Sequence, residues 1–259
     1  MDTARIAALL EPFLEPCRLD PAQLDQISIY IDLLQRWNAR INLTAIRNEN
    51  EIVTRHFGES FFLARHLFPK GTQAAGRSNE GETDASGSDA GESHTPPAPA
   101  GSTGNRQLAT GNSPHVIDIG SGAGFPALPL KIWAPAIRLT LIESNHKKAA
   151  FLREAARALT LTNINVITDR AETYAKQIQA HPENYPNMTR PDIVTLRAVE
   201  HFESILQTAA TLLPPTGRLA LLIGTTQLPH LTTLPTLSWN NPIHVPESHS
   251  RELLIGIQM

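Results

Sequence analysis

Apolar positions recur at helical spacing in the first part of the chain. Beyond residue 20 they follow one another at steps of three and four, as Leu24, Ile27, Ile31 and Leu34. This period predicts an amphipathic helix from residue 21 to about residue 40. Similar patterns predict shorter helices over 3–14 and 50–68. Residues 1–70 are therefore expected to form an N-terminal helical lobe.

A different composition follows over residues 71–114. Gly, Ser, Thr, Ala, Pro and Asn dominate this segment, with acidic residues scattered among them. Such a stretch offers almost no side chain that can enter a hydrophobic core. We expect a low-complexity, disordered insertion here, with a partner-binding tail as the less favoured alternative.

Short apolar runs then alternate with helical segments. Strands are predicted over 115–119, 138–143, 164–168, 191–197, 218–224 and 251–257. Helices are predicted between them, over 126–133, 145–160, 171–180 and 199–213. The alternation predicts an α/β domain over residues 115–259, with a mostly parallel sheet covered on both faces. Ligands of such sheets bind outside the carboxyl ends of the strands.

A glycine turn follows the first predicted strand. Gly120, Gly122 and Gly124 permit positive φ angles and let a ligand approach the backbone closely. Pro126 then begins the next predicted helix, whose first N–H groups are expected to point at an anion bound there. We therefore expect a small ligand at this turn.

The glycine spacing fits two classes of cofactor. Gly122, Gly124 and Ala127 satisfy the dinucleotide fingerprint, in which Ala can take the third position. Asp118 at the strand end favours another class, because a carboxylate attracts an ammonium group and repels a pyrophosphate. S-adenosyl-L-methionine has an amino group, a carboxylate and no phosphate. The pattern favours this cofactor and leaves an NAD-dependent oxidoreductase as the alternative.

Residues at three other strand ends are candidate cofactor contacts. Glu143 lies 23 positions after Gly120, near the place where doubly wound folds carry an acid for the ribose hydroxyls. Ala171 and Glu172 follow the third strand and are candidates for contacting an adenine, although acids are also common at helix starts. Arg197 ends the fourth strand, where a guanidinium can hold a phosphate or a cofactor carboxylate.

The overall composition narrows the class of protein. The chain has 22 basic and 25 acidic residues among 259, so any basic surface must be local. Its one cysteine, Cys17, excludes an internal disulfide and suggests a reducing compartment. No run approaches the roughly 18 apolar residues of a membrane span, and no pattern of a cleavable leader is present. We expect a cytoplasmic protein without membrane contact.

Several motifs together resemble one family. In chain order they are the run from Trp37 to Ile46, the Arg55-His56 pair, the segment from Asp118 to Leu130, Arg170-Ala171-Glu172 and Arg197-Ala198. This combination looks like the ribosomal small-subunit RNA methyltransferase G family, also called glucose-inhibited division protein B. The resemblance covers about residues 20–70 and 114–225 and is far more specific than any single motif.

The resemblance implies a Rossmann-like, S-adenosyl-L-methionine-dependent methyltransferase fold with an N-terminal helical lobe. It implies methyl transfer to N7 of one guanine in the decoding-region hairpin of 16S rRNA. The family's cofactor contacts map by motif onto Gly120, Phe125, Ala171, Glu172 and Arg197. Glu143 is added to this set from its position at a strand end.

The chain departs from the family pattern at several positions. Ala127 stands where Gly is usual, and Glu59 stands where Asp is usual after the Arg-His pair. Ile223 before Gly224 replaces a lysine, so another basic residue must substitute if that lysine holds RNA in relatives. The segment over 71–114 is also longer than expected. The missing lysine keeps open a non-catalytic RNA-binding protein with a relict pocket.

Guanine N7 requires no general base, because its lone pair is available at the major-groove edge. We therefore predict no catalytic residue and no metal ion, and interpret His56 as structural and Trp37 as core packing. Candidate phosphate contacts are the basic residues Arg36, Arg40, Arg47, Arg55, Lys147, Lys148 and Arg153. The predicted partner is small-subunit rRNA or a 30S particle, and the protein is predicted to be a monomer.

Overall fold

The computed structural model describes residues 1–70, 113–180, 190–198 and 201–259. By their contacts, residues 1–70 and 113–259 belong to one compact unit. The predicted disordered insertion lies outside the described residues, apart from its last two positions. Among the described helices, none is long and apolar enough to cross a membrane.

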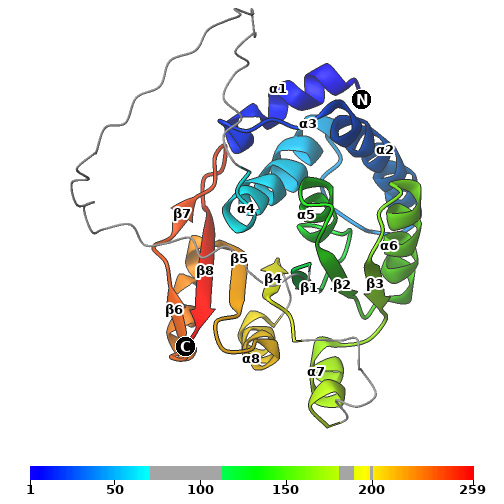
Figure 1. Cartoon of the computed structure of the whole chain (residues 1–259). Helices are drawn as coiled ribbons and strands as arrows, with labels where there is room; N and C mark the ends of the chain where they lie inside the picture. Colours follow the sequence, from blue (N-terminus) through cyan, green and yellow to red (C-terminus); the bar gives the residue numbers. More distant parts are fainter. Residues whose placement is uncertain (71–112, 181–189, 199–200) are drawn as a thin grey trace, which may run out of the picture. The chain divides into compact units, whose positions relative to one another are not determined.

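The N-terminal lobe is built from helices, as its periodicity predicts. α1 spans Thr3–Leu14 and α2 spans Pro21–Asn38 (Figure 1). Asp20 and Gln23 cap α2 reciprocally: the Gln23 N–H donates to the Asp20 carboxylate at 2.8 Å, and the Asp20 N–H donates to the Gln23 side chain at 3.1 Å. This capping box satisfies two backbone donors that the helix leaves unpaired.

The predicted helix over 50–68 is divided into three parts. α3 (Glu49–Glu51) leads into a π-helical segment, η1 (Ile52–Gly58), and α4 continues over Glu59–Leu67. π-helical turns are rare and occur frequently at functional sites. This one carries the Arg55-His56 pair that the sequence singled out.

In the described part of the chain, strands form one sheet in the order β3-β2-β1-β4-β5-β8-β6, and β7 pairs with β8. The parallel strands are β1 (His115–Ile119), β2 (Arg138–Ile142), β3 (Ile164–Ile167), β4 (Ile193–Arg197) and β5 (Arg218–Gly224). The antiparallel strands are β6 (Leu237–Trp239), β7 (Ile243–His244) and β8 (Arg251–Gln258). The order β3-β2-β1-β4-β5 is Rossmann-like, which confirms the predicted fold class.

Helices cover both faces of the sheet. They are α5 (Ala127–Trp133), α6 (His146–Ala158), α7 (Ala171–Ala180) and α8 (Phe202–Leu212). In Figure 1, α5 and α6 lie on the same side of the sheet as the lobe, and α7 and α8 lie on the other. The cores agree: Leu141 belongs to the cluster with the lobe, whereas its neighbour Ile142 belongs to the cluster with α7 and α8.

Specific contacts fix the lobe to the sheet domain. The Trp133 indole N–H donates to the Phe68 carbonyl at 2.8 Å. The buried Tyr30 donates its hydroxyl to the carbonyl of Ala123 in the glycine turn. Trp37 packs edge to face against α6, in agreement with its interpretation as a packing residue. The lobe therefore forms a wall beside the glycine turn.

The structure differs from the sequence prediction after β5. A 3-10 helix, η3 (Thr225–Thr233), and the strands β6 and β7 occupy a region in which the sequence predicted no element. The two strands have three and two residues, which is too short for an alternating pattern to show. Their pairing with β8 places that strand inside the sheet, between β5 and β6.

Candidate functional site

A cavity of about 640 Å³ opens at the carboxyl ends of the parallel strands. It lies where the strand order reverses, since β1 has β2 on one side and β4 on the other. All six cofactor contacts predicted from the sequence are among its lining residues: Gly120, Phe125, Glu143, Ala171, Glu172 and Arg197. The fold thus gathers at one cavity residues that follow or end four different strands. We call it the strand-end cavity.

The glycine turn has the backbone conformation that its sequence predicts. φ is +69° at Gly120, +54° at Gly122 and +86° at Gly124, values that L side chains rarely adopt. A Cβ at Gly124 would lie 2.4 Å from the Tyr30 hydroxyl oxygen. Glycine is therefore required both for the turn and for its close packing against the lobe.

The helix after the turn does not contribute as expected. α5 begins at Ala127, after Pro126, and all of its residues are buried. None of them is among the described residues that line the strand-end cavity, and the helix packs against α4 instead. The prediction that the first N–H groups of this helix face a ligand is therefore wrong.

Two backbone donors hold Glu143 directly after β2. The Gly122 N–H donates to Oε2 at 2.8 Å, and the Asn145 N–H donates to Oε1 at 2.7 Å. Each carboxylate oxygen can accept more than one hydrogen bond. Glu143 therefore braces the glycine turn and still presents acceptor capacity to the cavity.

The loop after β3 supplies the next part of the wall. Asp169 and Arg170 precede α7, and Ala171 and Glu172 begin it. All four line the cavity, with Ala171 buried and Glu172 half-buried. This segment lies beyond Glu143 in the sheet order, because β3 is the neighbour of β2.

Asp118 occupies a different place from the one its sequence position suggested. Its side chain is buried and is not among the described residues that line the cavity. The Thr195 hydroxyl donates to its Oδ1 at 2.6 Å, whereas Oδ2 has no partner in the described part of the chain. Burial raises the pKa of this carboxyl to about 6. The expectation of direct contact with a cofactor ammonium group is therefore wrong, because the Asp118 side chain is buried against Thr195 of the neighbouring strand β4.

Arg197 is held at the end of β4 by the lobe. Its Nη2 donates to Glu59 Oε2 at 2.8 Å and to the Arg55 carbonyl, and both charged side chains are buried. Burial lowers the pKa of Arg197, and the Glu59 carboxylate opposes this effect. Its Nη1 is buried without a partner among the described residues. The Nη2 edge of the guanidinium is therefore fixed by the lobe, whereas the N–H donors on Nη1 have no acceptor among the described residues.

The family-like run after Trp37 forms the loop beside the cavity. The Asn38 side chain accepts from the N–H groups of Leu43 at 2.9 Å and Thr44 at 3.1 Å, and donates to the Thr44 carbonyl at 3.0 Å. The Thr44 hydroxyl lies 2.8 Å from His56 Nε2. This loop therefore positions the imidazole at the cavity wall.

His56 stacks on Phe125, with ring centroids 4.6 Å apart and an interplanar angle of 13°. Phe125 also stacks with Tyr30, at 5.3 Å and 7°. Burial, together with neighbouring arginines, lowers the pKa of His56 to about 3. The imidazole is therefore neutral near pH 7, in agreement with its interpretation as a structural residue.

Two of the seven basic residues proposed for phosphate contacts line the cavity, Arg55 and Lys148. Arg153 donates instead to the Val166 carbonyl at 3.0 Å and the Thr168 hydroxyl at 2.7 Å. These bonds attach α6 to the end of β3, so Arg153 has a structural role here.

Sequence reasoning missed Arg251. It is the first residue of β8, lies opposite Gly224 of β5 and lines the cavity. Ile223 is 1% exposed, so the position at which the family resemblance implies a lysine presents no charge here. Arg251 supplies a cation at the same end of β5, which only the pairing of β5 with β8 reveals.

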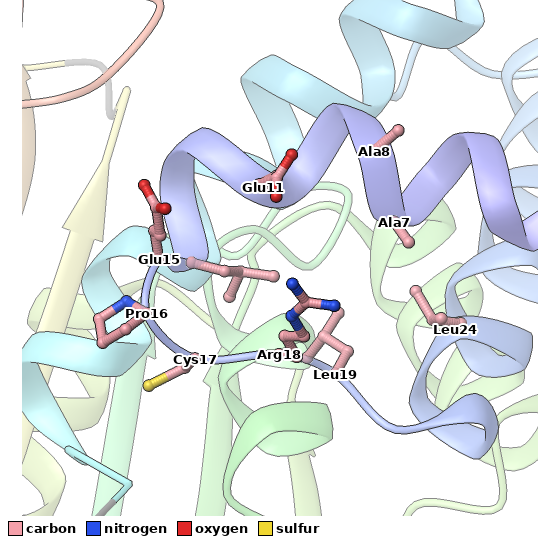
Figure 2. A pocket seen from close by; sticks show the side chains of 10 residues that line it. Ala7, Ala8, Glu11, Glu15, Pro16, Cys17, Arg18, Leu19 and Leu24 are labelled. Carbon is pink, nitrogen blue, oxygen red and sulfur yellow. The ribbon is translucent and has the colours of Figure 1, made fainter. Parts of the chain in front are cut away.

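A second cavity, of about 440 Å³, lies between α1 and the segment that leads into α2 (Figure 2). Small and apolar side chains, among them Ala7 and Leu24, line it together with Glu11, Glu15 and Arg18. Among the described residues, no group of three or more His, Cys, Asp or Glu side chains could hold a metal ion. The strand-end cavity is the candidate active site, because the predicted cofactor contacts line it.

Comparison with known proteins gives one family. The family model described as rRNA small subunit methyltransferase G matches residues 23–74 and 104–250. Proteins named ribosomal RNA small subunit methyltransferase G are similar to this chain: one from Roseiflexus castenholzii is 37% identical over 73% of this chain and 60% of its own length. One from Chloroflexus aggregans is 34% identical over 92% of this chain and 82% of its own length. One from Xanthomonas axonopodis pv. citri is 30% identical over 98% and 95%.

The chain spans less than two thirds of the Roseiflexus castenholzii relative and nearly the whole of the Xanthomonas one. Among solved structures, an S-adenosylmethionine-dependent O-methyltransferase from Thermotoga maritima is 15% identical, with a TM-score of 0.43 over 57% of this chain and 60% of that one.

Proposed function

The chain belongs to the rRNA small subunit methyltransferase G family, and we propose that it methylates N7 of a guanine in the decoding-region hairpin of 16S rRNA. S-adenosyl-L-methionine is the proposed methyl donor. The observation that carries the proposal is the strand-end cavity, because the five cofactor contacts expected from the family motifs line it together with Glu143, which was added from its position at a strand end. Its volume of about 640 Å³ is in the usual range for small-molecule sites.

The residues present fit this cofactor. Gly120 leaves its backbone open to close approach, and Glu143 retains acceptor capacity for the two ribose hydroxyls. The unsatisfied Nη1 of Arg197 is a donor suited to the carboxylate of the methionine part. Ala171 and Glu172 lie farther along the sheet, where we place the adenine. These assignments are proposals for the cofactor site.

When bound, S-adenosyl-L-methionine supplies a sulfonium methyl group that the N7 lone pair attacks directly. The chain needs no general base, and the low pKa of His56 leaves its imidazole uncharged near pH 7. The chain's contribution is to orient both reactants, an effect that can be worth about 7 to 11 kcal/mol. Phe125 and His56, stacked on each other, form a flat wall that limits the poses available in the cavity.

We further propose that the substrate is small-subunit rRNA or a 30S particle, acted on in the cytoplasm by a monomer without a metal ion. The division into a lobe over 1–70, an insertion over 71–114 and a methyltransferase domain over 115–259 also stays a prediction. The guanine is expected in an irregular or opened segment, because a paired and stacked base is hard to reach.

Methyl transfer to rRNA tests the proposal. The purified chain is incubated with 30S particles from a strain that lacks the modification and with methyl-labelled S-adenosyl-L-methionine. We expect label on a single guanine, mapped by mass spectrometry of rRNA fragments, and none with Gly120→Arg. Binding of S-adenosylhomocysteine without transfer to rRNA would instead favour a relict pocket. Binding of NAD in calorimetry would favour the oxidoreductase alternative.

A further inference from the structure

Two arginines on one side of the strand-end cavity have no side-chain partner in the described part of the chain. Arg55 comes from η1 and Arg251 from β8, and both line the cavity. Neither guanidinium forms a hydrogen bond or an ion pair with any described residue. Together with His56, these residues form what we call the arginine side of the cavity.

The carboxylates beside these arginines are already engaged. Glu59 pairs with Arg197 at 2.8 Å, and Glu252, which follows Arg251 in the chain, faces His244 at 3.2 Å. Three guanidinium groups act on the neutral His56, and of these only Arg197 forms an ion pair with a carboxylate among the described residues. Because like charges repel, an anion that enters the cavity stabilises this arrangement.

Two further observations point to an anionic ligand. The Arg197 side chain is only 6% exposed, and its buried Nη1 has no hydrogen-bond partner among the residues that the structure describes. The charges of Arg55, Arg197 and Arg251 also disfavour a proton on His56, in addition to the effect of burial. Among the described residues, Arg55 and Arg251 therefore have no carboxylate that pairs with them.

The position of Arg251 separates it from the proposed cofactor site. In the sheet order, β8 lies three strands from β1, by way of β4 and β5. Neighbouring strands are about 4.8 Å apart, which places β8 roughly 14 Å from β1. S-adenosyl-L-methionine has one carboxylate, and Arg197 on β4 is nearer to the glycine turn. The remaining arginines therefore face a different anion.

We propose that Arg55 and Arg251 clamp one backbone phosphate of the RNA, next to the guanine that enters the strand-end cavity. This inference rests on the proposed function, which makes RNA the substrate. A phosphodiester has two non-bridging oxygens, and guanidinium groups bind such oxygens in a forked geometry. Arg55 from the lobe and Arg251 from β8 would bind this phosphate from two different elements. The glycine turn would remain accessible to the cofactor.

RNA binding and turnover of the full chain test the clamp. Arg55→Ala and Arg251→Ala are compared with Arg18→Ala, which removes an exposed arginine beside the second cavity. Affinity for 30S particles that lack the modification is measured over a range of salt concentrations, and S-adenosylhomocysteine affinity by calorimetry. Circular dichroism and thermal unfolding establish that each variant is folded. Arg251→Lys keeps the charge and removes the fork.

Each clamp variant is expected to weaken particle binding and raise KM for the particle about tenfold, the range of a lost charge-assisted hydrogen bond. The slope of log affinity against log salt is expected to fall by about 0.7 to 1. Cofactor affinity and kcat stay near wild type, Arg18→Ala behaves as wild type, and Arg251→Lys recovers part of the affinity.

An unchanged KM and salt slope in both clamp variants would overturn the proposal. A loss of S-adenosylhomocysteine affinity as large as the loss of particle affinity would also overturn it, because the arginines would then serve the cofactor. The affinities of the variants for 30S particles test the proposed clamp even if no methyl transfer is observed. A wild-type chain that binds particles but transfers no methyl group refutes the proposed function alone.

Discussion

On one side of the strand-end cavity, Gly120, Glu143 and Ala171 each lie just after a parallel strand, and we call these residues with Glu172 the cofactor side. The arginine side instead takes Arg55 and His56 from a π-helical segment of the lobe, and Arg251 from an antiparallel strand. The cofactor side presents backbone groups and carboxylates, whereas the arginine side presents two guanidinium groups that have no partner among the described residues. This difference is the basis of our proposal that two ligands of different charge meet in one cavity.

The largest effect is expected from Gly120→Arg, which should weaken binding on the cofactor side and leave binding on the arginine side unchanged. In Gly120→Arg a long side chain enters the cofactor side at a φ of +69°, a backbone conformation that arginine rarely adopts. We expect S-adenosylhomocysteine affinity to fall at least about 100-fold, or about 3 kcal/mol, with methyl transfer lost. Particle affinity should change little, since the arginine side is intact. Ala158→Arg, at the exposed end of α6, is the control.

The buried ion pair at the boundary of the two sides gives the next effect. Glu59→Ala leaves Arg197 buried without a carboxylate, which is expected to cost about 3 to 5 kcal/mol of unfolding free energy. Urea denaturation measures the loss. Glu203→Ala removes the exposed partner of His230 and should cost about 1 kcal/mol or less. Equal losses in both variants would contradict the role given to Glu59.

The neutral imidazole of the arginine side predicts a pH dependence. The folded-state pKa of His56 is about 3, below its ordinary value of 6.5, so the unfolded chain binds this proton more strongly. Stability is therefore lost as pH falls below 6.5, by about 2 kcal/mol between pH 7 and pH 5. His56→Gln should lose that much less over the same interval in urea denaturation. A variant with the wild-type pH slope would show that His56 is not held neutral.

The smallest effect concerns the attachment of the lobe to the cofactor side. Tyr30→Phe removes the hydrogen bond to the Ala123 carbonyl but keeps the stacking on Phe125. We expect a loss of about 1 kcal/mol in unfolding free energy. The comparison is Ser28→Ala on the same helix, α2. It removes a half-buried hydroxyl that donates to the Met1 carbonyl, and it should cost less. A neutral Tyr30→Phe would mean that stacking alone holds the turn.

The sequence allowed the residues of the cofactor side to be placed at the carboxyl ends of the strands because their signals are local. Gly120 follows one predicted strand and Glu143 ends another, and the ends of parallel strands meet at one edge of the sheet. Asp118 shows the limit of this reasoning: its place in the strand was right, but whether its side chain faces the cavity depends on how β4 packs beside it.

The arginine side was largely out of reach of the sequence. The apolar period over residues 50–68 predicts a helix without revealing its π-helical part, so the direction of Arg55 was not determined. Arg251 gave no motif, and its place opposite Gly224 depends on an antiparallel pairing of distant segments. Glu59 appeared only as a departure from the family pattern, whereas the structure shows it paired with Arg197.

The most direct test of this division measures two affinities in two variants, Glu143→Ala and Arg251→Ala. Calorimetry gives the affinity for S-adenosylhomocysteine, and equilibrium binding gives the affinity for 30S particles that lack the modification. The division predicts that Glu143→Ala weakens only cofactor binding and that Arg251→Ala weakens only particle binding, each about tenfold. Loss of the same ligand in both variants would contradict it.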